Sequence, residues 1–391
     1  MGLDMKGDEM AVTLSSAENA LKNYYLDVVA DQLNNKVSPL MTAINRTSND
    51  IWGKEVIKPV ISSINGGFMA GTEDGTLPVS SGVKYDKFVL PLKNFYGTIE
   101  ISDKAMRASE NNTGAFVNLL NAEMESLIKS ASMNFGRMLF GDGSGKLAKV
   151  KQVNKDGTIK VDTVKNLVEG MIVDFVGYSG EYVLAEHKRI ISIDRVNNTI
   201  DIEKTSGVGM NNEVYKNSII TVQGSLDNEL TGLEAIFSKH GKLYGLDKAT
   251  HKWLNPYIKE KQGQITEEAL QAAIDHIEEN GGSINYIVCS IGVRSVLKKL
   301  LGCDPRGGAL SYNGIPIVAD RFCPDGTLYL LNTDDFTLHQ LCDWVWLESG
   351  DGHILHQVPG KPVYTATLVK YADLLCSRPC GQGKICGIIE E

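Results

Sequence analysis

The chain has 391 residues and carries 39 Lys and Arg against 48 Asp and Glu, a formal net charge of −9. Its content of 42% hydrophobic and 22% charged residues is typical of a folded chain and excludes a largely disordered one. At about 150 residues per domain, we expect two or three domains with a sizeable core. The acidic balance argues against a protein that grips DNA or an anionic membrane through its overall field.

The N-terminal segment and the cysteines indicate the compartment in which the protein is expected to work. The opening MGLDMKGDEMAVTL lacks the apolar core of a signal peptide, and no stretch approaches the ~18 apolar residues of a membrane span. The 7 cysteines are an odd and irregularly spaced set, which is a poor disulfide framework. We therefore expect reduced thiols, a cytoplasmic compartment and no membrane partner. CSRPCGQGKIC at 376–386 lacks the paired ligand spacing of a zinc site.

The N-terminal part is predicted to hold one helix and a long projection. Ser15 and Glu18 have the spacing of a capping box, and apolar residues then recur at helical period to residue 34. Residues 62–82 are rich in glycine and have loop composition. Beyond them, alternation around Phe88 and again from Phe95 predicts two strands, the first confined to a sheet edge by its proline. We expect 62–103 to form a two-stranded ribbon, which needs another surface to lie on.

A long helix is predicted over residues 113–140. Apolar side chains recur there at steps of three and four residues, which keeps one face apolar for about 42 Å. The glycine-rich GDGSG at 141–145 marks its end. Residues 146–224 then become rich in β-branched residues, with hairpin signals at NKDG (154–157) and VNNT (196–199). This pattern predicts an inserted small β-barrel.

The remainder is predicted to be an α/β region. A helix is expected over 265–280, with Thr266 as N-cap and Gly281 as its stop. The other expected elements are a strand at 284–290, a helix at 293–301, strands at 315–319 and 327–331, and a long strand at 363–376. No internal repeat is visible.

The tested catalytic signatures fail on spacing. GDGSGK at 141–146 is not a phosphate loop, because Phe140 and Leu147 occupy the positions that require Gly and Ser or Thr. No nucleophile elbow, dinucleotide fingerprint or HExxH occurs. His353 and His356 are interpreted as loop or strand residues rather than metal ligands. We therefore predict no catalytic residue, no cofactor, no metal site and no enzymatic activity.

Five segments, in this order, resemble the tailed-bacteriophage major capsid protein with the Hong Kong 97-type coat fold. They are ALKNYYLDVVADQLNNKVSPL (20–40), NGGFMAGTEDGTLPVSSGVKYDKFVLPLKNFYGTIEISDKAMRAS (65–109), FVNLLNAEMESLIKSASMNFGRMLFGDGSGKLA (116–148), INYIVCSIGVRSVL (284–297) and VYTATLVKYADLLCSRP (363–379). The resemblance implies an α+β fold with an N-terminal arm (1–58), an extended β loop (59–110), the spine helix of a peripheral domain (111–145), an axial α/β domain (225–350), and a returning peripheral strand with the C-terminus (351–391). Residues 146–224 depart from the family pattern as an inserted small all-β domain.

The resemblance implies a structural protein that self-assembles through hexamers and pentamers into an icosahedral virion shell in the host bacterial cytoplasm. Such a shell encloses double-stranded DNA without binding its sequence. The implied partners are copies of the chain, a separate scaffolding protein, a portal and possible decoration proteins. The exposed strand edges of the ribbon support this implication. In a monomer such edges promote unwanted pairing, whereas in a shell a neighbouring subunit covers them. The candidates for this contact are the apolar ribbon residues Phe88, Leu90, Leu92, Phe95 and Tyr96.

Two alternatives stay open at this point. An encapsulin-like shell of a cellular nanocompartment shares the fold and would copurify with an enzyme cargo. An enzyme of an unrecognised α/β family would need a pocket with convergent polar groups. Under the capsid hypothesis, removing residues 68–92 is expected to leave a folded subunit that does not assemble.

Overall fold

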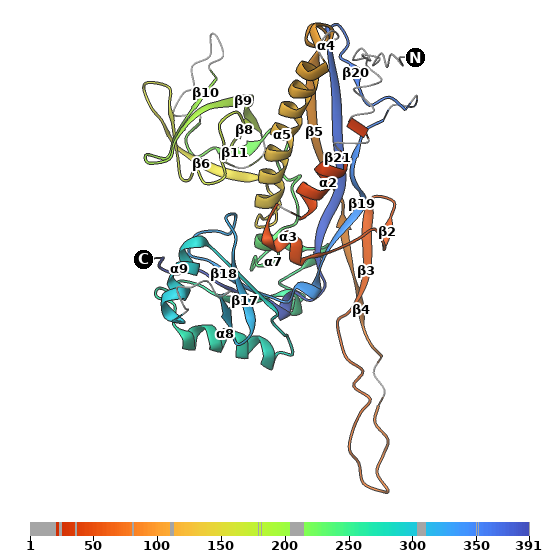
Figure 1. Ribbon diagram of the computed structural model, residues 1–391. Helices are drawn as coiled ribbons and strands as arrows, with labels where there is room; N and C mark the ends of the chain where they lie inside the picture. The colour runs from red at the N-terminus through yellow and green to blue at the C-terminus, as the bar shows by residue number, and fades with distance from the viewer. Residues whose placement is uncertain are drawn as a thin grey trace, which may run out of the picture. The chain divides into compact units, whose positions relative to one another are not determined.

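The computed structural model describes residues 21–22, 26–35, 37–79, 82–109, 113–178, 180, 182–203, 215–302, 310–348, 350 and 352–390. The expected capping box at Ser15 and Glu18 lies outside these residues. Two compact units divide the chain. Unit 1 draws on Met1–Thr42, Asn94–Gly136 and Gln340–Ala372, and unit 2 on Ala43–Lys93, Arg137–His339 and Asp373–Glu391. Figure 1 shows the elements of both, coloured along the chain.

Unit 1 combines helices with long strands. Its elements are α2 (Leu26–Asn35), α3 (Pro39–Ala43), α4 (Asp103–Ser109), α5 (Thr113–Met138), β5 (Lys93–Ser102) and β20 (His356–Gln357), with parts of β19 (Phe336–Trp346) and β21 (Val363–Cys376). β19 and β21 continue into unit 2, where β1 (Asn45–Thr47) pairs in parallel with β19. The 5-stranded sheet has the order β1-β19-β21-β20, and β5 also pairs with β21. The predicted strand 363–376 is thus confirmed.

The long helix α5 is confirmed and packs as its apolar period requires. Its ring of Phe135 stands edge-on to Phe95 of β5, with centroids 5.4 Å apart, and to Trp344 of β19, at 5.8 Å. Edge-to-face pairs of this kind are favourable beyond the area they bury. A Cβ at Gly97 would stand 2.8 Å from the Leu127 side chain, so a glycine is what allows β5 to approach the helix.

The predicted ribbon pairs differently from expectation. β3 (Glu55–Ile61) pairs antiparallel with β4 (Tyr85–Pro91), β2 (Ile51–Trp52) completes a 3-stranded sheet, and β5 pairs with β21 instead. Pairing β4 with β5 was wrong because only Leu92 separates them, and the common hairpin turns need at least two residues. β4 does lie at the edge of its sheet, as Pro91 predicted.

The predicted β-barrel is confirmed between residues 146 and 222. Strands β6 (Lys146–Val153), β7 (Ile159–Val161), β8 (Ile172–Val176), β9 (Val183–Asp194), β10 (Thr199–Ile202) and β11 (Ile219–Val222) close in the order β10-β7-β6-β11-β8-β9. Both hairpin signals fall at turns, where Gly157 has φ +93° and Asn198 has φ +52°. Val150, Phe175 and Ile220 lie in its buried core.

The α/β region has a 6-stranded sheet in the order β14-β22-β18-β15-β17-β16. Its elements are β14 (Tyr257–Lys259), α8 (Glu267–Glu279), β15 (Tyr286–Cys289), α9 (Ile291–Leu300), β16 (Ser311–Tyr312), β17 (Ile315–Ala319), β18 (Leu328–Leu331) and β22 (Gly383–Ile385). Short elements complete unit 2: α7 (Leu233–Ile236), β12 (Lys242–Leu243), β13 (Leu246–Asp247), η2 (Lys252–Leu254), η3 (Thr333–Asp335) and η4 (Pro379–Gly381).

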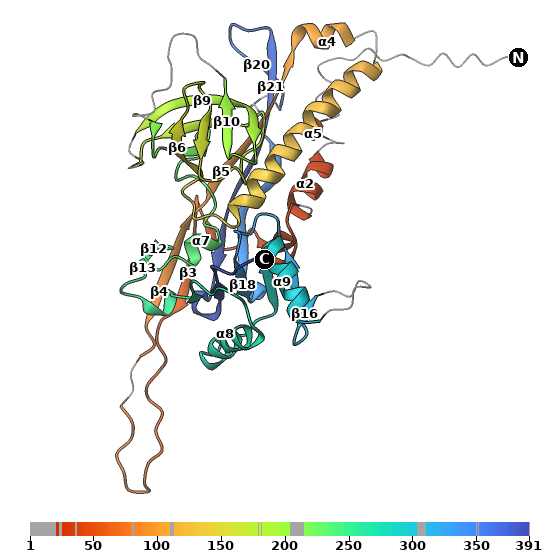
Figure 2. The same ribbon diagram turned by 90° about the vertical axis from the view of Figure 1, so that its left-hand side faces the viewer.

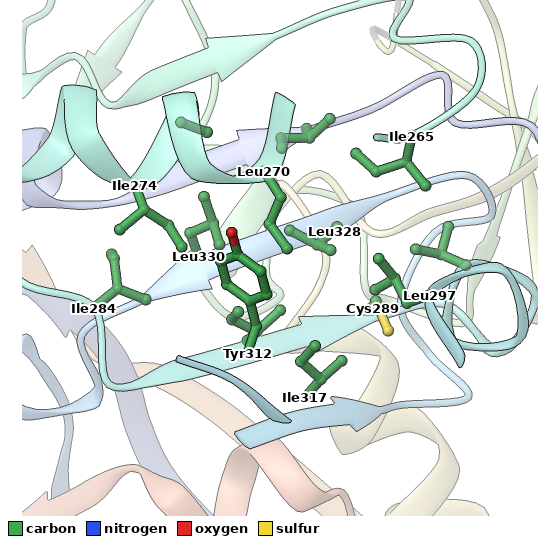
Figure 3. Packing of buried hydrophobic residues seen from close by; sticks show 14 of the residues in the cluster. Ile265, Leu270, Ile274, Ile284, Cys289, Leu297, Tyr312, Ile317, Leu328 and Leu330 are labelled. Atoms are coloured by element: carbon green, nitrogen blue, oxygen red, sulfur yellow. The ribbon is translucent and has the colours of Figure 1, made fainter. Parts of the chain in front are cut away.

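Capping residues determine where the helices of this region begin and end. Thr266 Oγ1 accepts from the Ala269 N–H at 3.2 Å, and Ser290 Oγ accepts from the Val293 N–H at 3.3 Å. Gly281, with φ +73°, follows α8 where the stop was predicted. The apolar faces of α8 and α9 pack on one cluster of strand residues, which Figure 3 shows around Leu270, Leu297 and Leu328.

Candidate functional site: an uncovered apolar loop

The described residues contain no cluster of three or more His, Cys, Asp or Glu that could hold a metal ion. His356 lies in strand β20, as expected for a residue that is not a helical ligand. The cysteines described are all free thiols, and burial raises the pKa of Cys289 to about 12. A thiol with a raised pKa stays protonated and is a poor nucleophile. No helix among the described residues is long and apolar enough to cross a membrane.

A cleft of about 570 Å³ in unit 2 is lined by residues of the barrel, the end of α5 and the α/β region. Its charged side chains largely neutralise one another. Arg137 donates two hydrogen bonds to Glu229, at 2.7 and 2.5 Å, and Lys165 pairs with Asp325. A site for a charged substrate needs groups free to turn to that substrate, so this cleft is better explained as a joint between two parts of unit 2.

The loop between β3 and β4, residues 62–84, carries large apolar side chains that its own subunit does not cover. Figures 1 and 2 show it extending past the strands that carry it. Ile64, Phe68, Leu77 and Val79 are 87%, 94%, 89% and 87% exposed. Its described residues form neither helix nor strand, and a turn closes its tip through the Gly75 N–H and the Thr72 carbonyl at 3.1 Å. Large apolar side chains grouped on one exposed segment mark an interaction site.

The base of the loop is anchored firmly. The Ser62 N–H donates to the Lys84 carbonyl at 3.0 Å, which holds the two ends together. The Val89 N–H donates to the Tyr244 carbonyl at 3.0 Å. The Tyr244 hydroxyl in turn accepts from the Cys376 N–H at 2.9 Å and donates to the Leu374 carbonyl at 3.2 Å. One buried tyrosine therefore ties β4 to β21. We call the paired strands β3 and β4 the platform of the loop.

The proposed contact residues on the ribbon divide into two groups. Phe88 is fully buried, with its ring 5.9 Å from Trp253 and 5.1 Å from Tyr244, and Leu90 and Phe95 are also buried within the subunit. Strand alternation turns these side chains inward, so they act as core residues. Leu92 is half-buried and Tyr96 is exposed, with its ring near Tyr371. We therefore keep Tyr96 and Leu92 as candidates for the contact between subunits and add the loop between β3 and β4.

Sequence reasoning missed the four exposed apolar residues of the loop. Their signal was present: Ile64, Phe68, Leu77 and Val79 stand in a segment whose Gly, Ser and Thr content leaves them no partner to pack on. The composition of the segment predicts only a loop, and hydrophobic alternation, which is strongest in the neighbouring strands, directs the contact prediction to those strands.

A buried carboxyl, Asp373, lies on β21 next to Leu374, whose carbonyl accepts from the Tyr244 hydroxyl. Asp373 of β21 accepts hydrogen bonds from the Thr231 N–H at 2.7 Å and the Thr231 hydroxyl at 2.9 Å. Burial nevertheless raises the pKa of Asp373 to about 7, because desolvation outweighs these hydrogen bonds and the attraction of Lys93. The folded chain thus holds this proton more tightly than the unfolded chain does.

This shift predicts a loss of stability as the pH rises. The carboxyl contributes fully below its unfolded pKa of about 4, and its contribution is lost as the pH passes from about 4 to about 7. Asp373→Asn removes the titration and keeps an oxygen that accepts from Thr231. Urea unfolding at pH 5 and pH 8 is expected to show a smaller drop for the variant than for the wild type. Equal drops in both proteins would refute the assignment, and the comparison cancels other titrating groups such as His339.

A scan of protein-family models finds no match to this chain, and no curated protein matches it. The solved structures do. The chain is similar to a structure described as the cyanophage A-1(L) capsid asymmetric unit, at 12% identity, with 93% of each chain covered and a TM-score of 0.55. The fold is thus a mixed α+β fold of the kind found in phage capsid proteins.

Other capsid structures resemble the chain over similar lengths. The capsid of the native GTA particle matches at 11% identity and a TM-score of 0.48, covering 92% of this chain and 90% of that one. The capsid of Myoviridae phage XM1 matches at 10% identity and a TM-score of 0.46, covering 90% and 92%. The cyanophage structure, whose match spans nearly all of both chains, is the one that establishes the fold.

Proposed function

We propose that this protein is the major capsid protein of a tailed bacteriophage and that copies of it assemble into the virion shell. The observation that carries the proposal is the likeness to a phage capsid structure over 93% of both chains, together with an anchored loop whose apolar residues find no cover in their own subunit. A shell built of many copies supplies that cover, because a head-to-tail contact repeats around a ring.

The finer assignments are part of this proposal. The chain takes the Hong Kong 97-type arrangement, with residues 1–58 as an N-terminal arm, 59–110 as the extended loop, 111–145 as the spine helix, 225–350 as the axial domain and 351–391 as the returning strand. The barrel at 146–224 is an insertion into that arrangement. Assembly takes place in the host cytoplasm, through hexamers and pentamers, with a scaffolding protein and a portal as partners. The acidic chain, of net charge −9, suits a container that holds DNA and later releases it.

Electron microscopy of the purified protein tests this function directly. Rings or closed shells are expected, either from the protein alone or when it is expressed with its scaffolding partner. A shell that contains a copurifying enzyme would instead favour a cellular nanocompartment. A chain that stays monomeric across protein concentration, salt and scaffold would contradict a role as a shell protein.

A further inference from the structure

Two helices on one face of the α/β sheet carry opposite charge. α8 presents carboxylates and no lysine or arginine: Glu267, Glu268, Asp275, Glu278 and Glu279. α9 presents basic groups and no carboxylate: Arg294, Lys298 and Lys299. Both helices bury their apolar sides in the same cluster, as Figure 3 shows for Leu270 of α8 and Leu297 of α9. Apart from Arg294, which is half-buried, the charged side chains of both helices are exposed.

On that face, the two helices lie toward opposite edges of the sheet. α8 contacts β14 and β22, and α9 contacts β17. In the strand order, β14 and β22 stand at one side and β17 stands next to β16 at the other. Figure 2 shows α8 and α9 as two separate helices of this region. The region thus has an acidic flank at α8 and a basic flank at α9.

The charges at the ends of these helices are not neutralised within the described residues. Glu278, Glu279, Lys298 and Lys299 are exposed, and none takes part in a described ion pair. The ion pairs found beside the sheet use other groups, Glu260 with Lys239 and Glu234 with Lys384. Near α8, Arg378 donates to the Asn280 carbonyl at 3.2 Å, which adds a single basic group against five carboxylates.

Near α9, the Glu390 carboxylate forms its hydrogen bonds at the start of the helix, away from the lysines. It accepts hydrogen bonds from the Ser290 hydroxyl at 2.5 Å and the Gly326 N–H at 2.6 Å. Lys298 and Lys299 lie in the last turn of α9, at the other end of the helix. Each flank therefore keeps the sign of its helix.

We infer that the α8 flank of one subunit docks on the α9 flank of a second copy of this chain. The inference rests on the proposed shell function and names the contact between neighbouring subunits of a ring. Two different patches of one chain that attract each other make a head-to-tail interface, which closes into a ring when the rotation allows it. Complementary charge steers such an encounter and penalises the wrong pairing of like flanks.

Charge reversal of each flank tests the contact. Because Glu278 and Glu279 of α8 and Lys298 and Lys299 of α9 lie in the last turns, the test acts there. Glu278→Lys with Glu279→Lys makes the last turns of both helices basic, and Lys298→Glu with Lys299→Glu makes both last turns acidic. Each variant alone is expected to assemble at least about tenfold less than the wild type, since like charges then meet at every interface. A 1:1 mixture of the two is expected to recover rings with an even number of subunits, such as hexamers, because the two kinds of subunit alternate there; a five-membered ring cannot alternate and stays weakened. The variant with all four substitutions restores opposite charge at the two last turns and is expected to assemble alone.

The four-substitution variant also separates folding from docking. Lysine in the last turn of α8 suits the helix dipole, whereas glutamate in the last turn of α9 opposes it. A folding defect would persist in that variant, whereas a docking defect would be relieved. Lys155→Glu with Lys160→Glu makes the same charge change on exposed barrel positions and is expected to assemble as the wild type does.

Sedimentation and microscopy give the readout, with thermal melting of each dispersed subunit as the check of folding. If the wild type assembles and either reversed variant also assembles normally, this contact alone is overturned. The contact is also overturned if the mixture, or the four-substitution variant, is folded but stays dispersed. A wild-type chain that forms no ring or shell overturns the proposed function and this contact together.

Discussion

Replacing Arg137 with methionine is expected to lower the free energy of unfolding by about 3–5 kcal/mol. The Arg137 guanidinium and the Glu229 carboxylate are both buried and joined by two hydrogen bonds, at 2.7 and 2.5 Å. Removing the cation leaves a carboxylate that has lost its partner and cannot reach water. The pair links the end of α5 to the start of the α/β region within unit 2, so we expect the loss to appear as a lower urea midpoint of the whole transition.

A matched control and a double variant sharpen this test. Arg107→Met breaks an ion pair on α4 whose arginine side chain is 70% exposed, and it is expected to cost less than about 1 kcal/mol. Arg137→Met combined with Glu229→Leu replaces both charges with apolar groups and is expected to recover most of the loss. If Arg137→Met and Arg107→Met destabilise the protein equally, the buried pair does not hold this joint.

Removing the loop is expected to abolish assembly while leaving the subunit folded. Residues 64–82 are replaced by a short Gly-Ser turn, which the hydrogen bond between Ser62 and Lys84 makes possible because it already holds the ends together. The exposed side chains contribute nothing to the core of their own subunit, so the melting temperature is expected to stay within a few degrees of the wild type.

Single substitutions give the same result in graded form. Truncating one interface anchor costs about 2 kcal/mol, about 30-fold in the association constant. Phe68→Ser is therefore expected to reduce shell yield strongly and to leave subunit stability unchanged. Thr76→Ser, at an exposed polar position of the same loop, is the matched control and is expected to assemble normally. Normal shells from the loop deletion would remove the loop from the interface.

The structure also changes where the deletion should be made. The cut at 68–92 expected from the sequence would remove β4, and with it the buried Phe88 and Leu90. Deleting two core side chains costs several kcal/mol, so that protein is now expected to unfold rather than to lose assembly alone. The comparison of the two deletions therefore distinguishes the platform from the loop that it carries.

Much of the secondary structure could be predicted because it depends on local chemistry. The apolar period of α5, the Thr266 cap with the Gly281 stop, and the turn residues of the barrel hairpins each act over a few residues, and each was confirmed. The strand at 363–376 was found with the expected bounds, because Val, Tyr and Thr are frequent in its first half and no Gly or Pro interrupts it.

Strand pairing and the interaction surface required the tertiary structure. The hydrophobic alternation of β4 is the same whether β4 pairs with β5 or with β3. The connection decides between them, because the single residue between β4 and β5 is too short for a hairpin turn. Alternation likewise shows which side chains share a face of a strand, but not whether that face is covered by Tyr244 and Trp253 or left open.

The sequence by itself determined most of the helices and strands, the barrel, and the failure of the tested catalytic signatures on spacing. These follow from patterns that depend on interactions between residues close in the chain, whereas the α+β class followed from the resemblance of five segments to a capsid family. The tertiary structure decided that Phe88 is core while Phe68 is exposed, that Arg137 meets Glu229, and that α8 and α9 offer flanks of opposite charge. Those facts depend on contacts between residues distant in the chain, and burial is a property of such contacts rather than of any residue alone.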